Sequence, residues 1–302
     1  MTRLTPLFVF WVGIHAFCQT PEQIRRTHYK ADASLVLVTV TVMDQHGTLV
    51  NGLRPDAFRI FDDKVSQQIF SVSEEDVPAS IGIILDMSGS MKDALNPAKF
   101  AVRVFLDTAN PEDEAFLYTV SSRPRRSTAF THDVNTLLSR IAISGAKGST
   151  PLIDTIYCGL DTMRPAGRGR KALLVISDGM DNYSRYSKRE LMDRVVEADV
   201  QIHTIAIYGA SAYAKAMQVQ EQRGGLALLQ DLAERSGGLH FVLRSADEIA
   251  AAAVKISRAI RNQYTIAYIP KSVDRDGKWH SIQVRLGVSG YRVYARPGYY
   301  AE

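Results

Sequence analysis

The stretch Ile81–Met91 constrains the fold of this chain more than any other. It reads Ile-Gly-Ile-Ile-Leu-Asp-Met-Ser-Gly-Ser-Met, so an apolar run ends in a carboxylate and a short Gly-containing loop follows. Such an apolar run is typical of a strand buried on both faces, as in a parallel sheet. The next segment, Pro97–Asp107, has apolar residues at helical spacing, namely Phe100, Val104 and Phe105. The order strand, polar loop, helix predicts an α/β domain with ligands at the carboxyl ends of its strands.

The loop after this strand carries oxygen-bearing side chains at alternate positions, Asp86, Ser88 and Ser90. In an extended or turning loop, this alternation can bring their oxygens to one point. Oxygen ligands without Cys or His suit Mg²⁺, Mn²⁺ or Ca²⁺ rather than zinc. From these residues alone a local explanation is equally open, because Asp and Ser side chains also form turns and helix caps.

Two further loops favour the metal interpretation. The segment Gly145–Pro151 precedes a predicted helix, and Thr150 as N-cap of that helix would by itself explain the loop. The apolar run Leu173–Ser177 is followed by Asp178, so a second buried strand also ends in a carboxylate. Two such strands with a Thr loop between them are difficult to explain by turn chemistry alone.

After Asp86, strands and helices alternate along the chain. This order indicates a doubly wound, mostly parallel central sheet of Rossmann-like type with helices on both faces. Strands are expected over residues 115–120, 172–178, 201–208 and 238–242. Helices are expected over residues 134–141, 152–163, 188–198, 226–236 and 246–262. Two of them begin with a capping-box sequence, Ser187-x-x-Glu190 and Ser245-x-x-Glu248.

Short β-rich segments flank this α/β region on both sides. Strands are expected over residues 35–42, 58–61, 68–72, 264–269, 281–286 and 291–296. Because the ends of a domain often lie close in space, we expect the two flanks to pack together as a small accessory β unit. The predicted domains are a β segment over 34–78, the α/β domain over 79–262, and a second β segment over 263–302 that packs with the first.

The amino terminus predicts export. Residues 1–18 have a positive start at Arg3, an apolar core, and small residues at Ala16 and Cys18, which is the pattern of a cleaved secretory signal peptide. The apolar core is short for a membrane span, so none is expected after cleavage. Residues 19–33 are predicted to be a linker, and the mature chain is expected to be periplasmic or secreted.

The two cysteines agree with a cleaved signal. Lipid anchoring at Cys18 is not favoured, because the bulky Phe17 precedes it. Once Cys18 is removed, Cys158 is alone and no intrachain disulfide is expected. Cys158 lies in a helix-like pattern and is predicted to be a small buried residue.

Charge argues against nucleic acid as the partner. The formal net charge is +4, and basic residues gather over 123–126 and 164–171. No series of aromatic residues is interleaved with them, as a stacking platform for bases would require. Both clusters are expected to be solvated loops.

The side chains of the three loops resemble the metal-ion-dependent adhesion site of von Willebrand factor type A domains in order and spacing. They are Asp86, Ser88, Ser90, Thr150 and Asp178. The resemblance covers roughly residues 79–262. The flanks also resemble a bacterial, particularly acidobacterial, subgroup of related proteins. These have a short β region before the domain and, after it, a Tyr-rich strand region that ends in Ala-Arg-Pro-Gly-Tyr, the sequence of residues 295–299 here.

This resemblance implies a role for each residue. Ser88, Ser90 and, in the ligand-bound state, Thr150 would bind the ion directly. Asp86 and Asp178 would act directly or through water. Mg²⁺ is the ion expected, with Mn²⁺ or Ca²⁺ as alternatives, and an open coordination position would take an Asp or Glu carboxylate of a partner protein.

Family members gate such a site by moving the Thr and Asp loops together with the adjoining helix. The resemblance therefore makes the helix over 246–262 the candidate switching element. Whether this chain switches is a hypothesis, and the sequence predicts neither the partner's identity nor an oligomeric state.

A secreted hydrolase is the alternative function. It would use Ser88 as nucleophile with Asp178 and His203 as partners, or the ion site of Asp86 and Asp178. The segment around Ser88 lacks a Gly-x-Ser-x-Gly elbow, and neither a general base nor a phosphate-binding loop is evident. The sequence therefore favours a non-enzymatic binding module.

Four lesser candidates have ordinary structural explanations. Asp181 and Asn182 extend the third loop and are predicted to be turn residues. His203 lies in a predicted strand and is expected to be a packed histidine. Lys147 is expected to be a solvated loop lysine.

Overall fold

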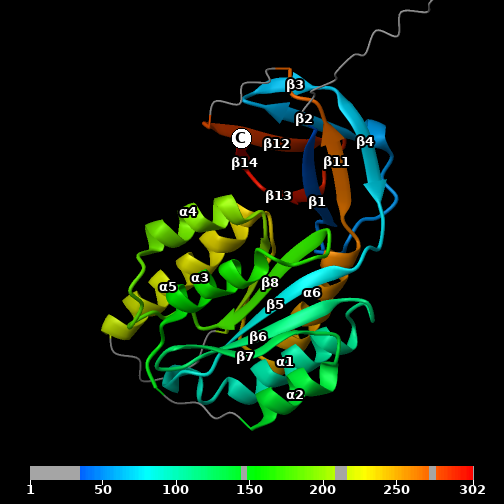
Figure 1. The fold of residues 1–302 in the computed structure, drawn as a ribbon. Coiled ribbons are helices and arrows are strands. Elements are labelled where there is room, and N and C mark those ends of the chain that lie inside the picture. Colours follow the sequence, from blue (N-terminus) through cyan, green and yellow to red (C-terminus); the bar gives the residue numbers. More distant parts are fainter. Residues whose placement is uncertain (1–34, 144–147, 208–215, 272–276, 302) are drawn as a thin grey trace, which may run out of the picture. The chain divides into compact units, whose positions relative to one another are not determined.

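A computed structural model describes residues 35–143, 148–207, 216–271 and 277–301 (Figure 1). The expected signal peptide, the linker over 19–33, Cys18 and Lys147 lie outside the described residues. Residues 34–302 form one compact unit by their contacts. None of the helices described is both long and apolar enough to cross a membrane.

A six-stranded sheet forms the centre of the α/β part, in the order β10-β9-β8-β5-β6-β7. Its strands are β5 (Ala79–Asp86), β6 (Glu114–Val120), β7 (Pro124–Thr131), β8 (Arg170–Ser177), β9 (Gln201–Ile207) and β10 (His240–Leu243). All neighbouring pairs are parallel except β6 and β7. The chain runs outward from β5 to β6 and β7 and then returns to β8 on the other side of β5. The switch point of the sheet therefore lies between β5 and β8.

Helices cover both faces of this sheet. They are α1 (Leu95–Asp107), α2 (Val134–Ala142), α3 (Leu152–Met163), α4 (Lys188–Ala198), α5 (Ala216–Ser236) and α6 (Ala246–Arg261). α1, α2 and α6 share one apolar core with the sheet, and α3, α4 and α5 share the other (Figure 1). β5 is buried at every position, as its apolar run predicts. The doubly wound α/β architecture expected from the sequence is confirmed.

The helix starts follow local chemistry. α4 and α6 begin at the predicted capping boxes, where Ser187 and Ser245 accept hydrogen bonds from the backbone N–H groups of Glu190 and Glu248. α5 begins at Ala216, well before the expected start, because its first part lacks the apolar pattern that the prediction used.

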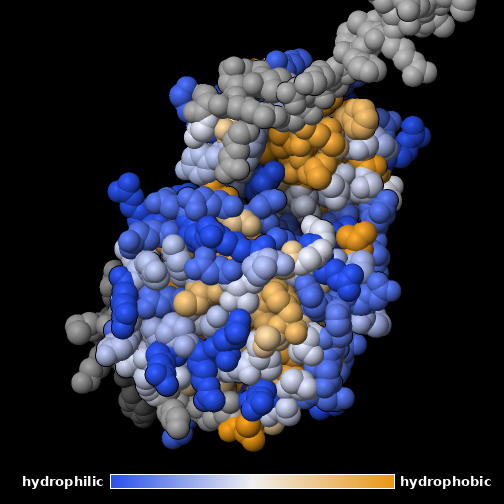
Figure 2. All heavy atoms as spheres, viewed as in Figure 1, coloured by the Kyte–Doolittle hydropathy of each residue, from blue (hydrophilic) through white to orange (hydrophobic). Residues whose placement is uncertain are grey.

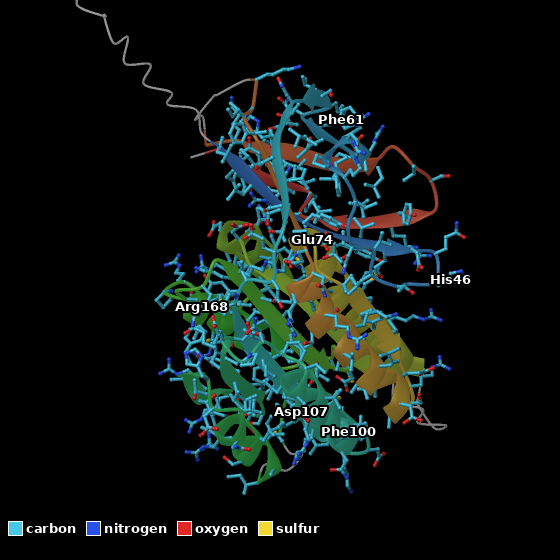
Figure 3. All side chains as sticks on the ribbon, turned by 90° about the vertical axis from the view of Figure 1, so that its right-hand side faces the viewer. His46, Phe61, Glu74, Phe100, Asp107 and Arg168 are labelled. Carbon is cyan, nitrogen blue, oxygen red and sulfur yellow. The ribbon has the colours of Figure 1, made fainter. Side chains whose placement is uncertain are left out.

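Three sequence-based expectations in this part are wrong. The basic segment 164–171, expected to be a solvated loop, enters β8 at Arg170, whose guanidinium donates to the backbone carbonyls of Ile260 and Arg261. The basic segment 123–126, expected to be a loop, enters the antiparallel edge strand β7, where Arg125 and Arg126 are exposed. An edge strand accepts such charges because one of its sides is free of partners. On α1, Phe100 points away from the core and is 52% exposed (Figure 3). The small residues Ala98 and Ala101 contact the core in its place.

The flanking segments form two antiparallel sheets, in the orders β13-β1-β11-β4 and β14-β12-β2-β3. The strands are β1 (Val36–Asp44), β2 (Phe58–Asp62), β3 (Val65–Gln67), β4 (Ile69–Glu74), β11 (Tyr264–Tyr268), β12 (Trp279–Leu286), β13 (Tyr291–Ala295) and β14 (Gly298–Tyr300). β1 pairs with both β11 and β13, so strands from the two ends of the chain share one sheet. Inward-facing apolar residues of both sheets form a third core, which includes Val38, Phe58 and Ile266.

The surface of this β unit differs from that of the α/β part. Leu37 of β1, Phe70 of β4 and Ile269 after β11 are exposed. Figure 2 shows apolar colours gathered over the β unit, whereas the visible face of the α/β part is mostly hydrophilic.

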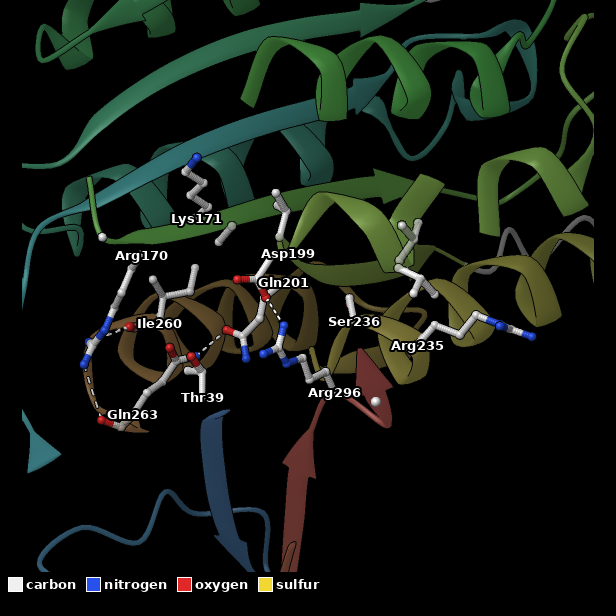
Figure 4. A pocket seen from close by; sticks show the side chains of 16 residues that line it. Thr39, Arg170, Lys171, Asp199, Gln201, Arg235, Ser236, Ile260, Gln263 and Arg296 are labelled. Atoms are coloured by element: carbon white, nitrogen blue, oxygen red, sulfur yellow. Dashed lines mark hydrogen bonds and ion pairs between the residues drawn. The ribbon is translucent and has the colours of Figure 1, made fainter. Parts of the chain in front are cut away.

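Two chain connections join the β unit to the α/β part. β4 ends at Glu74, just before β5 (Figure 3), and α6 ends just before β11. A small cavity of about 80 Å³ lies at this junction and is lined by polar side chains (Figure 4). Within it Gln263 donates to Gln201 at 2.5 Å, and Arg296 pairs with Asp199 at 2.6 Å. These two contacts connect side chains of the α/β part, Gln201 and Asp199, to residues of the following β segment, so we call this junction the joint between the two parts.

Candidate metal centre at the ends of β5 and β8

Adjacent strands bring the two predicted carboxylates to one edge of the sheet. Asp86 is the last residue of β5, and Asp178 directly follows the last residue of β8. β5 and β8 are paired in parallel register up to Leu85 and Ile176. Both carboxylates therefore lie at the carboxyl ends of the strands that flank the switch point, where ligands bind in folds of this class.

Hydrogen bonds from two loops fix the Asp86 carboxylate. Its Oδ1 accepts from the backbone N–H of Ser88 at 2.9 Å, and its Oδ2 accepts from the Ser177 hydroxyl at 2.5 Å. Ser177 in turn accepts from the backbone N–H of Gly179 at 2.9 Å. Sequence analysis missed Ser177, although its place immediately before Asp178 is a signal that could have found it.

The electrostatics of the pair favour a cation. Burial, and after it the nearby negative charge of Asp178, raise the pKa of Asp86 to about 6, against the hydrogen bonds from Ser177 and Ser88, which lower it. No basic side chain is among the groups that shift it. A buried carboxylate with a like charge beside it is stabilised by a cation bound between the two. An oxygen-only donor set fits Mg²⁺, Mn²⁺ or Ca²⁺.

The two serines of the first loop lie together. The hydroxyls of Ser88 and Ser90 are 3.0 Å apart, held by the short 3-10 turn η2 (Gly89–Met91). Ser88 precedes this turn but does not cap it with its side chain. A local turn therefore explains the position of Asp86 Oδ1, which accepts from Ser88 N–H. It does not explain why the hydroxyls of Ser88 and Ser90 lie together, because neither caps the turn.

Thr150 is not the helix cap that the sequence suggests as its ordinary role. α3 begins at Leu152 with Pro151 at the N-cap, and no side-chain cap bond is made there. Thr150 is instead held by its backbone: its N–H donates to Asn182 Oδ1 at 2.9 Å, and its carbonyl accepts from Asn182 N–H at 3.1 Å. Within the described part of the chain its hydroxyl makes no hydrogen bond, which leaves it available to a ligand.

The third loop supplies the missing cap of α3. Asp181 accepts from the backbone N–H of Ile153 at 2.8 Å, and Ser184 accepts from that of Asp154 at 3.0 Å. The first N–H groups of a helix lack partners within it, and here another loop provides them. Asp181 and Asn182, expected to be simple turn residues, therefore connect the Asp178 loop to the Thr150 loop.

Glycines let the three loops approach closely. Gly179 has φ of +79°, and a Cβ there would lie 2.3 Å from the carbonyl oxygen of Gly225 on α5. Gly148 has φ of +88°, and its carbonyl accepts from the N–H of Gly89 in the first loop at 3.3 Å. A side chain at either position would be strained in conformation, and it would collide with α5 at Gly179 and with Ser122 of the β6–β7 connection at Gly148.

The remaining candidates lie apart from this group. His203 is fully buried, its Nδ1 accepts from Leu239 N–H at 3.1 Å, and burial lowers its pKa to about 3. It is a packed histidine, as expected, and no hydrogen bond joins it to Ser88 in the described structure. Cys158 is half-buried rather than buried, and burial raises the pKa of its thiol.

A second group of possible metal ligands lies in the β unit. Asp62, Asp63 and His280 have ligand atoms within 4.8 Å of one another. Tyr268 and Tyr299 donate to Asp62 Oδ2 at 2.7 and 3.0 Å, and this negative charge helps to raise the pKa of both phenols. The network links the two sheets. Sequence analysis named no site here, because only the pairing of β12 with β2 brings His280 to the acids.

Comparisons with known proteins also indicate a von Willebrand factor type A domain. The profile of the von Willebrand factor type A domain matches residues 81–180. No curated protein matches the chain significantly. Among solved structures, the von Willebrand factor type A protein of Catenulispora acidiphila is 12% identical, covers 88% of this chain and 73% of its own, and has a TM-score of 0.51.

Two further solved structures are more distant in sequence or coverage. The pilus adhesin SpaC of Lactobacillus rhamnosus GG is 10% identical, with 83% of this chain and 49% of that chain covered and a TM-score of 0.50. BatB of Bacteroides thetaiotaomicron is 18% identical over 60% of this chain and 98% of its own, with a TM-score of 0.46. The matched profile and the fold shared with the Catenulispora acidiphila protein agree with the resemblance of the three loops, and residues 81–180 match the von Willebrand factor type A domain.

Proposed function

We propose that this protein is an exported, non-enzymatic binding module that engages a protein partner through a divalent ion. The ion, Mg²⁺ in the first instance, would be held by Asp86, Ser88, Ser90, Thr150 and Asp178. An Asp or Glu carboxylate of the partner would take the coordination position that these residues leave open.

One observation carries the proposal. The carboxylates of Asp86 and Asp178 lie at the switch point of the sheet, and the charge of Asp178 helps to raise the pKa of the buried Asp86, with no basic group among those that shift it. The hydroxyls of Ser88 and Ser90 converge beside them, 3.0 Å apart. The two carboxylates neutralise the charge of a divalent ion but leave no excess negative charge at the site. The ion would therefore still attract a partner's carboxylate to its open coordination position.

Support for a binding role also comes from the architecture. The site lies on loops carried by a rigid sheet, where binding residues are commonly found. The fold is one that the pilus adhesin SpaC shares. The hydrolase alternative gains nothing from the structure, because His203 is enclosed in the core and accepts from Leu239.

Export belongs to the same proposal. Residues 1–18 would be the signal peptide, and the mature chain would act in the periplasm or outside the cell. Mass spectrometry of the chain secreted by a host cell is expected to find Gln19 at the new amino terminus. An intact Met1 in the exported fraction would contradict cleavage.

Calorimetric titration with Mg²⁺ and Mn²⁺ tests the ion site. We compare the wild type with Asp86→Ala and with Asp63→Ala, a control that disables the second acidic group. Binding that is lost in Asp86→Ala and kept in Asp63→Ala supports the proposal. The reverse result would assign the ion to the β unit, and equal binding by all three proteins would place it elsewhere, so either result overturns the site.

A turnover assay separates the two function classes. Wild type and Ser88→Ala are incubated with Mg²⁺ and generic ester and phosphoester substrates. We expect no turnover by either protein. Hydrolysis by the wild type that Ser88→Ala abolishes would favour the hydrolase.

A further inference from the structure

A pocket of about 600 Å³ lies beside the candidate ion site. It is lined by the β6–β7 connection, the start of α3, and the loop between β8 and α4. The residues that carry the argument are Ser122, Arg123, Pro151, Asp154, Tyr186 and Arg185. We refer to it below as the arginine–tyrosine pocket.

This pocket and the ion site share their supporting loops. Asp86 is in register with Val120, and the β6–β7 connection that holds Arg123 follows directly. Pro151, in the pocket lining, directly follows Thr150. The loop of Thr150 therefore contributes both to the candidate ion site and to the lining of the pocket.

The tyrosine wall of the pocket is preorganised. Tyr186 stacks on Tyr157 of α3 with ring centroids 4.1 Å apart and an interplanar angle of 10°. The backbone N–H groups of Arg185 and Tyr186 both donate to Asp154 Oδ1, at 2.9 and 3.0 Å. Tyr183 also lines the pocket and is 65% exposed, so the wall offers an aromatic surface to an incoming side chain.

Of the four charged side chains that line the pocket, only the two arginines have no hydrogen-bond partner within the described chain. Asp154 is engaged by the backbone of the third loop, and Glu190 is engaged by Ser187 in the capping box of α4. The guanidinium groups of Arg123 and Arg185 make no hydrogen bond or ion pair within the described chain, and both side chains are exposed. Two guanidiniums without partners favour a carboxylate, which they can bind by charge-assisted hydrogen bonds.

We propose that the arginine–tyrosine pocket binds a second acidic side chain of the same partner segment whose first carboxylate reaches the ion. The partner is then an extended peptide segment with two acidic residues close in sequence. This inference rests on the proposed function, because the first carboxylate needs the ion site. The pocket adds selectivity that the ion alone, which accepts any carboxylate, does not provide.

Binding of defined peptides tests this inference. The probes are fluorescent Ala/Gly peptides with blocked ends that contain either a single Asp or the same Asp with one Glu at successive positions on either side. With Mg²⁺ present, we expect the best two-acid peptide to bind the wild type about tenfold more tightly than the single-Asp peptide, as one charge-assisted hydrogen-bonded contact provides. The double variant Arg123→Gln/Arg185→Gln is expected to bind both peptides equally.

A matched pair of substitutions separates the pocket from the general field of positive charge. Arg125→Gln/Arg126→Gln removes the same charge from β7, outside the pocket lining. It is expected to preserve most of the tenfold preference. An equal loss in both double variants, or equal affinity of the wild type for all peptides, overturns the pocket while leaving the proposed function intact.

Asp86→Ala distinguishes failure of the pocket from failure of the ion site. It is expected to abolish binding of the single-Asp peptide. If no peptide binds the wild type, or if Asp86→Ala binds as the wild type does, the proposed function and this inference both fail.

Cys158 gives a readout inside the pocket, since it lines it and is half-buried. In the full chain with Cys18→Ser, the two-acid peptide is expected to slow alkylation of Cys158 by N-ethylmaleimide, and the single-Asp peptide is not. Equal protection by both peptides would contradict occupancy of the pocket by the second acid.

Discussion

Buried polar groups in this chain differ in whether they have partners. Ser177 is fully buried and its hydroxyl holds both Asp86 and the Gly179 backbone. Ser257 on α6 is also buried, but its hydroxyl has no hydrogen-bond partner in the described structure. The same residue type thus has opposite energetic roles, because an unpartnered buried hydroxyl is unfavourable whereas a partnered one fixes its neighbours.

We therefore expect Ser177→Ala and Ser257→Ala to differ in sign. Ser177→Ala leaves an oxygen of Asp86 without its donor and should lower the free energy of unfolding by about 1–3 kcal/mol. It should also weaken Mn²⁺ binding about tenfold or more, as loss of a group that orients a metal ligand does. Ser257→Ala should leave both quantities unchanged or raise stability slightly. Urea unfolding and calorimetry measure the two effects, and similar losses in both variants would contradict this account.

His203 makes stability depend on pH. Its pKa is about 3 in the fold, against 6.5 as the ordinary value, because burial disfavours the charged imidazolium. Between these values the unfolded chain binds more protons than the folded one, so stability falls as pH falls. From pH 7 to pH 5 this contribution is a loss of about 2 kcal/mol.

The variant His203→Asn isolates this contribution. It keeps an acceptor for Leu239 N–H and removes the titration. Its free energy of unfolding is expected to fall less between pH 7 and pH 5 than that of the wild type, by the same amount of about 2 kcal/mol. Parallel pH profiles for the two proteins would show that His203 does not titrate on unfolding.

At the scale of elements, α3 depends on a loop that is distant in sequence. Asp181 and Ser184 cap its N-terminus, while Asn182 brackets Thr150 through two backbone hydrogen bonds. Hydrogen bonds therefore hold the start of α3 and the loop of Asp178 together. In the ion site this arrangement couples the Thr150 loop to the Asp178 loop.

Asp181→Ala tests this coupling against an ordinary cap. Asp133 caps α2 by accepting from Asn135 N–H at 2.9 Å, and the other hydrogen bond of its carboxylate, from the Thr136 hydroxyl, also lies within α2. Both Asp181→Ala and Asp133→Ala should lower the free energy of unfolding by about 1 kcal/mol, the usual effect of losing an N-cap. Only Asp181→Ala should also weaken Mn²⁺ binding. Loss of ion affinity in Asp133→Ala, or none in Asp181→Ala, would contradict the coupling.

At the scale of the whole molecule, one guanidinium connects the two parts of the described chain. Arg170, the first residue of β8, donates to the backbone carbonyl oxygens of Glu75, Ile260, Arg261 and Gln263. Figure 4 shows the bonds to Ile260 and Gln263. These carbonyls belong to both connections between the β unit and the α/β part. Because α6 ends here, the joint also anchors the helix that the family resemblance makes the candidate switching element.

Arg170→Met should uncouple the two parts. Four backbone carbonyls lose this donor, three of them at partly buried contacts, so we expect the free energy of unfolding to fall by about 3 kcal/mol or more. The single unfolding transition should broaden or split, as near-UV and far-UV circular dichroism in urea would show. Arg168→Met, close by in sequence, removes a guanidinium that makes no hydrogen bond or ion pair in the described structure, and should change stability by less than about 0.5 kcal/mol. A sharp single transition in Arg170→Met would contradict this role.

The sequence by itself determined the elements whose signals are local. The apolar run before Asp86 specified a buried strand, capping boxes marked the starts of α4 and α6, and alternation of strands with helices specified the doubly wound sheet. The sequence also placed Asp86 and Asp178 each at the end of a buried strand, whereas the pairing of these two strands came from the structure. These features follow from burial and hydrogen bonding within a few residues, which local sequence encodes.

Only the tertiary structure decided which distant groups meet. Asn182 brackets Thr150, Ser177 holds Asp86, and Arg170 gathers carbonyls from two connections. Strand pairing brought His280 to Asp62 in the same way. Such contacts depend on sheet order and loop approach, and any polar residue in a loop is equally suited to a local turn. Their roles became visible only when the fold fixed which donor faces which acceptor.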